Sequence, residues 1–560
     1  MHQVSGRHLI ERDDRPQIDE DFLVMSHDFS YANTRSSCAC VADETQGPYK
    51  GDASAAIPIP VSSSLMIRTK IIATMGPACG DVETLYRLFE AGTDVCRLNF
   101  SHGSLDQHLL TLRNIHEAAA RFDRPVAILG DLGGPKIRLG PIADQDGTGG
   151  MVRNPGDALI IQRQPITGAN GRVSTTVPTL IDDIRVGDRI YVEDGLLRFL
   201  CVDKQNDEIH CTCHVGGILK SSKGINLPNT RINVPSITDR DWQCAEWAVD
   251  NDLDYLALSF VRNAADIELL RQYLRNRSSD IQIIAKIEKA EAVADIDNII
   301  AASDGLMVAR GDLGVEMDLA QVPIIQKDLV RRAQAAGKPV IVATQMLQSM
   351  IEHSTPTRAE VSDVANAIFD GTDAIMLSGE TSVGKFPVGA VLTMAHIADI
   401  TEKYLNEQAR PDARPLRLQT MQLSNAIARG VKQMVEDLKL KLVILWSQTG
   451  GPARIFSKNR FPVPIIALST DHRALRRMTL HYGVIPFEAA PPATLDEMVD
   501  QVDAMAREKK LCTNGDRMVI VTGSSLGTPG MMNGVVVHTA GTRATNAALG
   551  AAADARGIAT

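Results

Sequence analysis

The sequence predicts an α/β protein whose central domain is a (β/α)8 TIM barrel, interrupted by a small β domain and followed by an α/β sandwich. From Ile67 onward the chain alternates short apolar strands, polar loops and helical patterns. Eight of these strands are apolar on both faces, as strands covered by helices are. A polar residue stands at the end of each one, where such a barrel gathers its active site. An open doubly wound sheet is the competing arrangement, and the polar strand ends favour the barrel.

The predicted barrel, the catalytic domain, occupies residues 66–138 and 237–400. Its strands are expected at residues 71–74, 95–99, 126–129, 255–259, 281–286, 305–309, 340–344 and 374–377. The polar side chains at their ends are Thr74, Arg97 with Asn99, Asp131, Ser259, Lys286 with Glu288, Asp312, Thr344, and Ser378 with Glu380. One charged strand end could be structural, but this many around one rim indicate a functional site.

Residues 139–236 interrupt the series of strands and helices. They contain short alternating runs at 189–192, 196–202 and 209–215, separated by Gly, Pro and Asp. This pattern is typical of a small antiparallel β domain, which we expect to be a β-barrel lid. Because it is inserted at the catalytic end of the barrel, it is placed to close over a substrate and exclude water.

One segment of this insertion resembles a metal-binding cluster: His210, Cys211, Cys213 and His214 lie within five residues. Strand alternation puts the two cysteines on one face and the two histidines on the other, so they cannot converge on one ion. We therefore expect the cysteines to lie in the core of the inserted domain.

Residues 401–540 are predicted to form a separate α/β sandwich. Helix 424–437 precedes strand 442–446, and strands follow at 465–468, 484–487, 518–522 and 535–538. The loops 447–451 and 522–527 could bind phosphate through backbone N–H groups at helix N-termini. Ordinary turn chemistry explains these loops equally well, and the sequence does not identify an effector.

Residues 379–386 nearly match the nucleotide-binding pattern G-x-x-x-x-G-K-[ST]. The last position must supply a hydroxyl to Mg²⁺, but it holds Phe386, and Pro387 follows. We interpret this stretch as the loop after the eighth barrel strand.

Both ends of the chain differ from its centre. Residues 1–65 are polar, weakly periodic and acidic in patches, without the apolar core of a signal peptide or the acid-poor composition of a transit peptide. We expect a disordered extension, although a natural start at Met66 would also account for the pattern. Residues 541–560 are rich in Ala, Gly and Thr, which is typical of a flexible tail.

Composition excludes several classes of function. With 58 basic and 68 acidic residues, the net charge of −10 argues against affinity for nucleic acid or anionic membranes. No apolar run approaches the roughly 18–20 residues that span a bilayer. Nine cysteines, an odd number in a large chain, indicate free thiols and a reducing cytoplasm.

The most informative feature is the pair Lys286 and Glu288, which follow an apolar strand on one pleat face. Asp312 follows the next apolar run in the same way. Two acids that can hold a divalent metal beside one fixed ammonium suit chemistry on a phosphorylated, anionic substrate. A salt bridge at a strand end is the plainer alternative for this pair alone.

Several motifs, in order from about Arg68 onward, resemble those of pyruvate kinases. They are residues 97–103 (RLNFSHG), 131–138 (DLGGPKIR), 223–228 (KGINLP), 284–288 (IAKIE), 309–314 (ARGDLG), 343–350 and 356–360 (PTRAE). The resemblance implies an enzyme that transfers a phosphoryl group from phosphoenolpyruvate to ADP, giving pyruvate and ATP in the last step of glycolysis. It also implies Mg²⁺ or Mn²⁺, a cytoplasmic homotetramer and a possible allosteric effector.

The resemblance assigns roles to matching positions. The metal ligands would be Glu288 and Asp312, and the catalytic residues Lys286, Arg97, Thr344 and, more weakly, Ser378. Substrate contacts would come from Arg97, Lys286, Ala309, Arg310, Gly311, Asp312 and Thr344. Nucleotide contacts would come from Asn99, His102, Arg138 and Lys223, the last delivered by the lid.

One position departs from many family members. Members that K⁺ activates carry glutamate where this chain has Lys136. The usual K⁺ ligands of these members are matched here by Asn99, Ser101, Asp131 and the Leu132 carbonyl. A tethered ammonium can substitute for a monovalent cation, so we expect K⁺ to be dispensable. A solvated lysine beside an ordinary K⁺ site is the alternative.

Two other functions remain open on the sequence. Another Mg²⁺-dependent barrel enzyme acting on enolpyruvate or 2-oxo acids, such as a lyase, would need neither Lys223 nor a nucleotide. A catalytically silent paralogue could instead sense metabolites through the third domain, but every catalytic position that can be matched is intact.

Overall fold

The computed structural model describes residues 67–144, 147–228, 230, 232–408, 422–523 and 532–542. The predictions for residues 1–65, for most of the tail 541–560 and for part of the loop 522–527 lie outside these described residues. None of the helices in the described ranges is long and apolar enough to cross a membrane.

The central domain is the predicted closed barrel of eight parallel strands. Around the barrel the strands follow the order β1-β16-β15-β14-β13-β12-β3-β2. They are β1 (Lys70–Thr74), β2 (Thr93–Asn99), β3 (Ala127–Asp131), β12 (Tyr255–Leu258), β13 (Gln282–Ile287), β14 (Gly305–Ala309), β15 (Val340–Ala343) and β16 (Ala374–Leu377). Each predicted range overlaps the strand that it anticipated.

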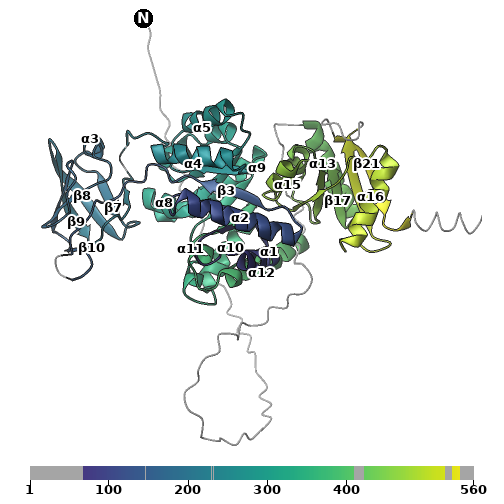
Figure 1. Ribbon diagram of the computed structural model, residues 1–560, viewed down its shortest axis with the longest axis horizontal. Helices are drawn as coiled ribbons and strands as arrows, with labels where there is room; N and C mark the ends of the chain where they lie inside the picture. The colour runs from purple at the N-terminus through teal and green to yellow at the C-terminus, as the bar shows by residue number, and fades with distance from the viewer. Residues whose placement is uncertain are drawn as a thin grey trace, which may run out of the picture. The chain divides into compact units, whose positions relative to one another are not determined.

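Helices cover the outside of this barrel (Figure 1). They are α1 (Val82–Ala91), α2 (Leu105–Phe122), α4 (Asp239–Asp250), α5 (Ala264–Asn276), α6 (Ala290–Ala294), α7 (Ile296–Ala302), α8 (Arg310–Glu316), α9 (Val322–Ala335), α10 (Arg358–Phe369), α11 (Gly379–Ser382) and α12 (Pro387–Glu407), with 3-10 turns η1 (Leu319–Gln321) and η2 (Gln348–Ile351). The stretch 379–386 lies after the last barrel strand as predicted, but it opens with the short helix α11 rather than an irregular loop.

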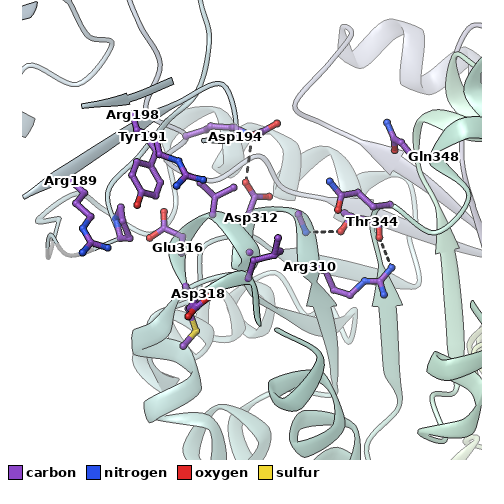
Figure 2. A pocket seen from close by; sticks show the side chains of 18 of the residues that line it. Arg189, Tyr191, Asp194, Arg198, Arg310, Asp312, Glu316, Asp318, Thr344 and Gln348 are labelled. Carbon is purple, nitrogen blue, oxygen red and sulfur yellow. Dashed lines mark hydrogen bonds and ion pairs between the residues drawn. The ribbon is translucent and has the colours of Figure 1, made fainter. Parts of the chain in front are cut away.

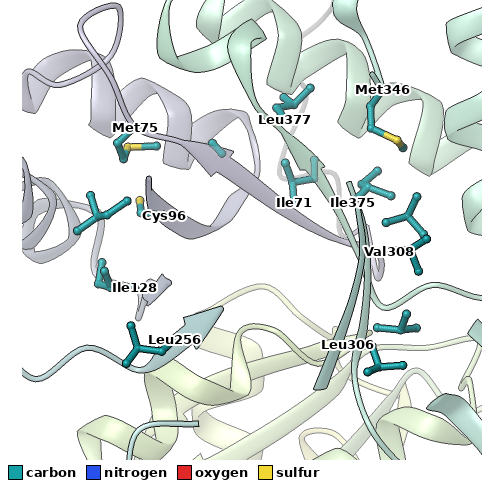
Figure 3. Packing of buried hydrophobic residues seen from close by; sticks show 14 of the residues in the cluster. Ile71, Met75, Cys96, Ile128, Leu256, Leu306, Val308, Met346, Ile375 and Leu377 are labelled. Carbon is teal, nitrogen blue, oxygen red and sulfur yellow. The ribbon is translucent and has the colours of Figure 1, made fainter. Parts of the chain in front are cut away.

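Strand alternation explains why the barrel strands are apolar on both faces. Ile71 packs outward in the cluster between strands and helices (Figure 3), whereas its neighbour Ile72 lies in the cluster inside the barrel. Leu480, from the C-terminal domain, joins the inner cluster. The barrel is therefore a packed core, and the polar side chains are confined to its ends.

The insertion forms a six-stranded sheet in the order β11-β7-β8-β9-β5-β6 and a separate pair, β10-β4. Its elements are β4 (Met151–Arg153), β5 (Ala158–Gln162), β6 (Arg172–Ser174), α3 (Leu180–Asp183), β7 (Arg189–Val192), β8 (Leu197–Gln205), β9 (Glu208–Val215), β10 (Gly217–Leu219) and β11 (Ile225–Asn226). Neighbouring strands are antiparallel except for the parallel pair β5 and β6. Cys211 and Cys213 are buried in its core, as predicted, and no cluster of metal-ligating residues occurs in the described residues.

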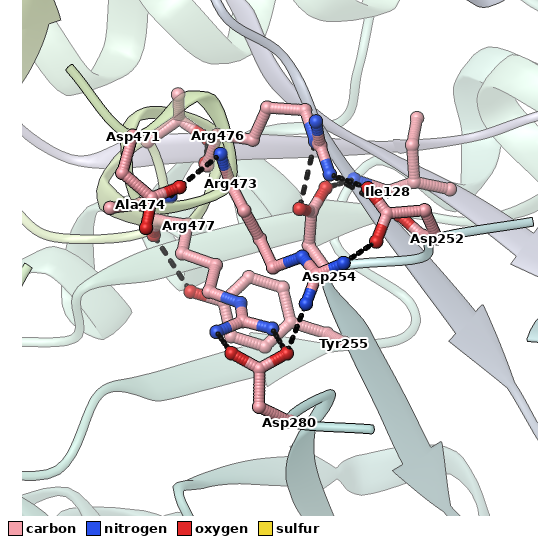
Figure 4. A network of polar contacts seen from close by, with 11 residues as sticks. Ile128, Asp252, Asp254, Tyr255, Asp280, Asp471, Arg473, Ala474, Arg476 and Arg477 are labelled. Carbon is pink, nitrogen blue, oxygen red and sulfur yellow. Dashed lines mark hydrogen bonds and ion pairs between the residues drawn. The ribbon is translucent and has the colours of Figure 1, made fainter. Parts of the chain in front are cut away.

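The C-terminal domain is a five-stranded sheet, β19-β18-β17-β20-β21, parallel except for the edge strand β21. Its elements are α13 (Gln422–Leu438), β17 (Leu442–Trp446), α14 (Gly451–Lys458), β18 (Ile465–Ser469), α15 (His472–Met478), β19 (Val484–Glu488), α16 (Leu495–Glu508), β20 (Arg517–Gly523) and β21 (Met532–Thr539). Helix α15 contacts the N-terminal ends of the barrel strands, where the Tyr255 hydroxyl donates to the Arg477 carbonyl at 2.7 Å (Figure 4).

Candidate active site at the C-terminal rim of the barrel

Lys286 is buried near the end of β13 and is surrounded by oxygen atoms. Its Nζ donates to Ser259 Oγ at 2.6 Å and lies 3.2 Å from Asp131 Oδ1 and 2.9 Å from Glu288 Oε1. Burial alone would lower the pKa of Lys286, but the charges of Asp131 and Glu288 raise it above its ordinary value. The rim therefore contains a fixed ammonium group that stays charged at neutral pH.

Arg97 places a second cation beside Lys286. Its Nε donates to Asp131 Oδ2 at 2.7 Å, and its Nη1 donates to Thr74 Oγ1 at 2.9 Å. Burial would raise the pKa of Asp131, but the charges of Lys286 and Arg97 lower it. Asp131 thus orients both cations from within the barrel, and neither can rotate freely away from the rim.

Glu288 is almost completely buried beside Lys286. Its Oε2 accepts a hydrogen bond from the Phe260 N–H at 2.6 Å, whereas Oε1 accepts none from the described residues despite its contact with Lys286. Burial raises the pKa of Glu288, the Lys286 charge opposes this, and the nearby charge of Asp312 raises it further. Two acids this close together, one of them buried, suit a divalent cation.

Asp312 lies in the first turn of α8, and Lys136 Nζ is 3.7 Å from its Oδ1. Two carboxylates, Glu288 and Asp312, fit Mg²⁺ or Mn²⁺, because Mg²⁺ is usually held by one or two carboxylates together with waters and substrate oxygens. This donor set is therefore compatible with the expected metal.

Thr344, directly after β15, has a left-handed backbone with a φ of 69°, and Gln345 follows with a φ of 54°. Thr344 Oγ1 accepts a hydrogen bond from the Gly311 N–H at 2.7 Å and donates to the Ala343 carbonyl at 2.6 Å. A β-branched residue in this region of φ is a genuine outlier, and such strain concentrates at functional sites.

Buried Glu380 supports the same part of the rim. Its Oε1 accepts from the Leu347 N–H at 3.1 Å, and its Oε2 accepts from the Ser378 N–H at 2.7 Å. Glu380 therefore links the segment after β15 to the segment after β16. Ser378 and Thr344 line the same cavity.

The predicted nucleotide contacts lie on neighbouring segments, because Arg138 Nη1 donates to the Ser222 carbonyl at 3.0 Å, next to Lys223. Burial lowers the pKa of His102, and the charges of Arg138, Arg97 and Lys136 lower it further, so these side chains share one neighbourhood. Lys223 pairs with Glu193 of the insertion at 2.5 Å. Asn99 Oδ1 accepts from the Ser101 N–H at 3.2 Å.

Oxygens of Asn99, Asp131 and Leu132, three of the four positions that the resemblance assigns to a monovalent cation, are engaged within the protein. Both carboxylate oxygens of Asp131 contact Lys286 or Arg97. The Leu132 carbonyl accepts from Ser259 Oγ at 2.7 Å. Ser259 therefore belongs to this polar network. The sequence placed Ser259 at a strand end but indicated no role for it.

A cavity of about 850 Å³ lies between the barrel rim and the insertion. Asp312, Thr344, Ser378 and Lys136 line one side, and the insertion contributes Arg189, Tyr191, Asp194 and Arg198 (Figure 2). The Arg198 guanidinium lies over the Tyr191 ring, 5.2 Å from its centroid. Arg189 and Tyr191 were not predicted, although strand alternation puts these two residues on one face.

Comparisons with known proteins identify the relatives of this chain. The barrel-domain model of the pyruvate kinase family matches residues 66–391, and its α/β-domain model matches residues 425–538. A pyruvate kinase from Geobacillus stearothermophilus is 44% identical over 475 residues, which cover 84% of this chain and 80% of that relative. One from Mycobacterium tuberculosis is 39% identical over 474 residues, covering 85% of this chain and 98% of the relative.

The fold of a solved relative agrees with these matches. A crystal structure of a pyruvate kinase from Cryptosporidium parvum superposes with a TM-score of 0.76 at 34% sequence identity. The alignment covers 85% of this chain and 96% of that structure.

Proposed function

Because the chain belongs to the pyruvate kinase family, we propose that it transfers the phosphoryl group of phosphoenolpyruvate to ADP, giving pyruvate and ATP in the last step of glycolysis. One observation carries this proposal: the buried Lys286 ammonium, oriented by Asp131 and Glu288, lies at the rim beside Arg97. Phosphoryl transfer needs little covalent work from the protein, so fixed positive charge and alignment supply most of the rate.

Each cation has a defined task in this proposal. Lys286 stabilises the negative charge on the phosphoryl group during transfer, and Arg97 binds one of its oxygens. Thr344, whose Oγ1 accepts from the Gly311 N–H, would bind the substrate together with the segment from Ala309 to Asp312. Because these groups come from several strands and from the first turn of α8, all held by one barrel, they are preorganised before substrate binds.

Glu288 and Asp312 would hold Mg²⁺ or Mn²⁺, which supplies positive charge to the phosphate oxygens when bound. The burial of Glu288 beside a second acid, Asp312, supports this assignment. His102, Arg138, Lys223 and Asn99 would contact ADP.

The second half of the reaction is protonation of the enolate of pyruvate on one carbon face. Thr344 and Ser378 both line the cavity, which supports a role for them in that proton transfer. The insertion would act as a lid, since its side chains form the opposite wall of the same cavity.

We propose the location and the assembly from the resemblance, and the thiols support the location. The seven described cysteines are all free and buried, which supports a reducing cytoplasm. A homotetramer and a possible effector at the C-terminal domain complete the proposal.

Replacing Lys286 with Met tests the central assignment. We expect turnover with phosphoenolpyruvate, ADP and Mg²⁺ to fall by roughly 10³-fold or more, while binding of phosphoenolpyruvate weakens far less. Steady-state kinetics and equilibrium binding measure the two effects. Lys289→Met is the matched control, because Lys289 is a similarly buried lysine that pairs with Glu316 at 3.2 Å.

Other outcomes would contradict the proposal. Equal losses in turnover and binding would make Lys286 a binding residue that does not stabilise the charge of the phosphoryl group during transfer. Wild-type activity on a 2-oxo acid that does not depend on ADP would indicate a lyase. Absence of activity in the wild type would indicate a silent paralogue.

A further inference from the structure

Arg310 lies at the wall of the cavity, but its hydrogen bonds are made within the protein. A guanidinium group has five N–H donors. Nε faces the Ala343 carbonyl at 3.4 Å, and Nη2 faces the Thr344 carbonyl and Met346 Sδ, both at 2.8 Å. Nη1 faces Asp363 Oδ1 at 2.7 Å and Gln326 Oε1 at 3.5 Å. With these five acceptors, the side chain can bind a substrate only by giving up a contact.

The acceptors of Arg310 include the two carbonyls that flank the strained position. Its guanidinium contacts Ala343 O and Thr344 O, which lie on either side of the Thr344 φ of 69°. Figure 2 shows the contact with Thr344. An L-residue held in this conformation, with its Cβ crowded against the backbone, persists only where the surroundings over-determine it. Arg310 supplies that restraint from α8.

Asp363 fixes Arg310 from outside the cavity. It lies on helix α10, and the only partner of its side chain among the described residues is Arg310. The same helix supplies Glu360, which accepts from the Ser349 N–H at 2.7 Å. Helix α10 therefore supports the segment after β15 at two points, once directly and once through Arg310.

We propose that Asp363 and Arg310 form a strut that holds Thr344 in its left-handed conformation, so that the Thr344 hydroxyl stays hydrogen-bonded to the Gly311 N–H at the wall of the cavity. Asp363 is thus a positioning residue, because it does not itself line the cavity and acts through Arg310. The kinetic part of this inference rests on the proposed function, because it requires Thr344 to act on phosphoenolpyruvate and pyruvate.

Replacing Asp363 with Ala tests the strut. Because a displacement near 1 Å can cost about 10²-fold in rate, we expect kcat for pyruvate formation to fall by ~10-fold or more, with KM for ADP unchanged. Exchange of the pyruvate methyl protons with solvent deuterium, followed by NMR without nucleotide, should slow by a similar factor. Asp363→Asn keeps an acceptor oxygen and should restore most of both rates.

A matched variant separates positioning from general stability. Asp328 is 39% exposed, compared with 36% for Asp363, and pairs with Arg332 at 2.7 Å on the outer helix α9. Asp328→Ala should leave both rates at the wild-type level. If Asp363→Ala leaves both rates unchanged, or if Asp328→Ala lowers them equally, the strut is wrong.

Crystallography of Asp363→Ala decides the question even if the wild type proves inactive on phosphoenolpyruvate. We expect Thr344 to leave the left-handed region and its hydroxyl to separate from the Gly311 N–H. An unchanged φ with the hydroxyl still on Gly311 would overturn the proposal, whereas wild-type inactivity would overturn only the proposed function.

Discussion

At the scale of single residues, Lys136 is the position that departs from many family members, and its side chain lies at the candidate site. Its ammonium lies 3.7 Å from a carboxylate oxygen of Asp312, with side-chain exposures of 34% and 23%. A charge tethered beside Asp312, the proposed metal ligand, can replace a monovalent cation that would otherwise bind nearby. Asp131 and Leu132, which would be ligands of that cation, already have partners within the protein. These contacts also support the hypothesis that K⁺ is dispensable.

Reversing the charge at Lys136 and measuring how the activity responds to K⁺ tests this role. We expect the wild type to form pyruvate at its full rate in buffer free of K⁺ and NH₄⁺, whereas Lys136→Glu should lose most activity there and recover on addition of K⁺. Lys403→Glu, an exposed reversal on α12 outside the cavity, is the control. If Lys136→Glu leaves the K⁺ response unchanged, the tethered-cation hypothesis is wrong.

At the scale of elements, helix α15 joins the C-terminal domain to the barrel through three arginines. Arg473, Arg476 and Arg477 occupy one helix face, because residues three and four apart are neighbours. Arg477 binds both carboxylate oxygens of Asp280, at 2.9 and 3.0 Å, and Arg476 Nε donates to Asp254 at 2.9 Å (Figure 4).

These ion pairs differ in how deeply their carboxylates are buried. Asp254 is fully buried, and burial raises its pKa to about 6 even though the Arg476 charge opposes the shift. Asp280 is 62% exposed, and its hydrogen bonds with Arg477 lower its pKa to about 2. Removing the cation from the pair that contains Asp254 should therefore cost the most stability, because the remaining buried carboxylate cannot recover solvation by water.

Single substitutions on α15 test this difference. Arg476→Met should lower the free energy of unfolding by ~3–5 kcal/mol at pH 8, because it leaves Asp254 buried without a cation. Arg473→Met, which removes pairs to the exposed Asp252 and Asp280, should cost less than ~1 kcal/mol. The Arg476→Met penalty should shrink at pH 5, below the raised pKa of Asp254, where that carboxyl is protonated. Equal losses of unfolding free energy for Arg476→Met and Arg473→Met, measured by urea unfolding at pH 8, would contradict this ranking.

At the scale of the whole molecule, the sequence predicted what depends on periodicity and missed what depends on tertiary contacts. Strands such as β14 were found with their observed bounds, since burial on both faces leaves a continuous apolar run. The left-handed Thr344 and Gln345 were not found, because neither is a residue type that signals positive φ. Lys458 was also missed: a lysine at the end of a helix normally faces solvent, yet here it is buried against Asp373.

The interface between the C-terminal domain and the barrel contains a buried histidine that should make stability depend on pH. His481 lies between α15 and β19, and burial lowers its pKa to about 3, with further lowering by the charges of Lys458, Arg454 and Lys70, against the opposing charge of Asp373. The folded state therefore keeps His481 neutral, whereas the unfolded chain takes up a proton below pH 6.5. Its contribution to stability is complete above that pH and is lost as the pH falls toward 3.

Between pH 7 and pH 5 this single proton should cost about 2 kcal/mol of unfolding free energy. His481→Gln should reduce the loss of stability over that interval by a similar amount, because glutamine takes up no proton in the unfolded chain. His472→Gln, at an exposed position on α15, should leave the interval unchanged. Urea unfolding of the full chain at both pH values gives the comparison. An equal pH dependence in the wild type and His481→Gln would show that protonation of His481 is not linked to unfolding of this interface.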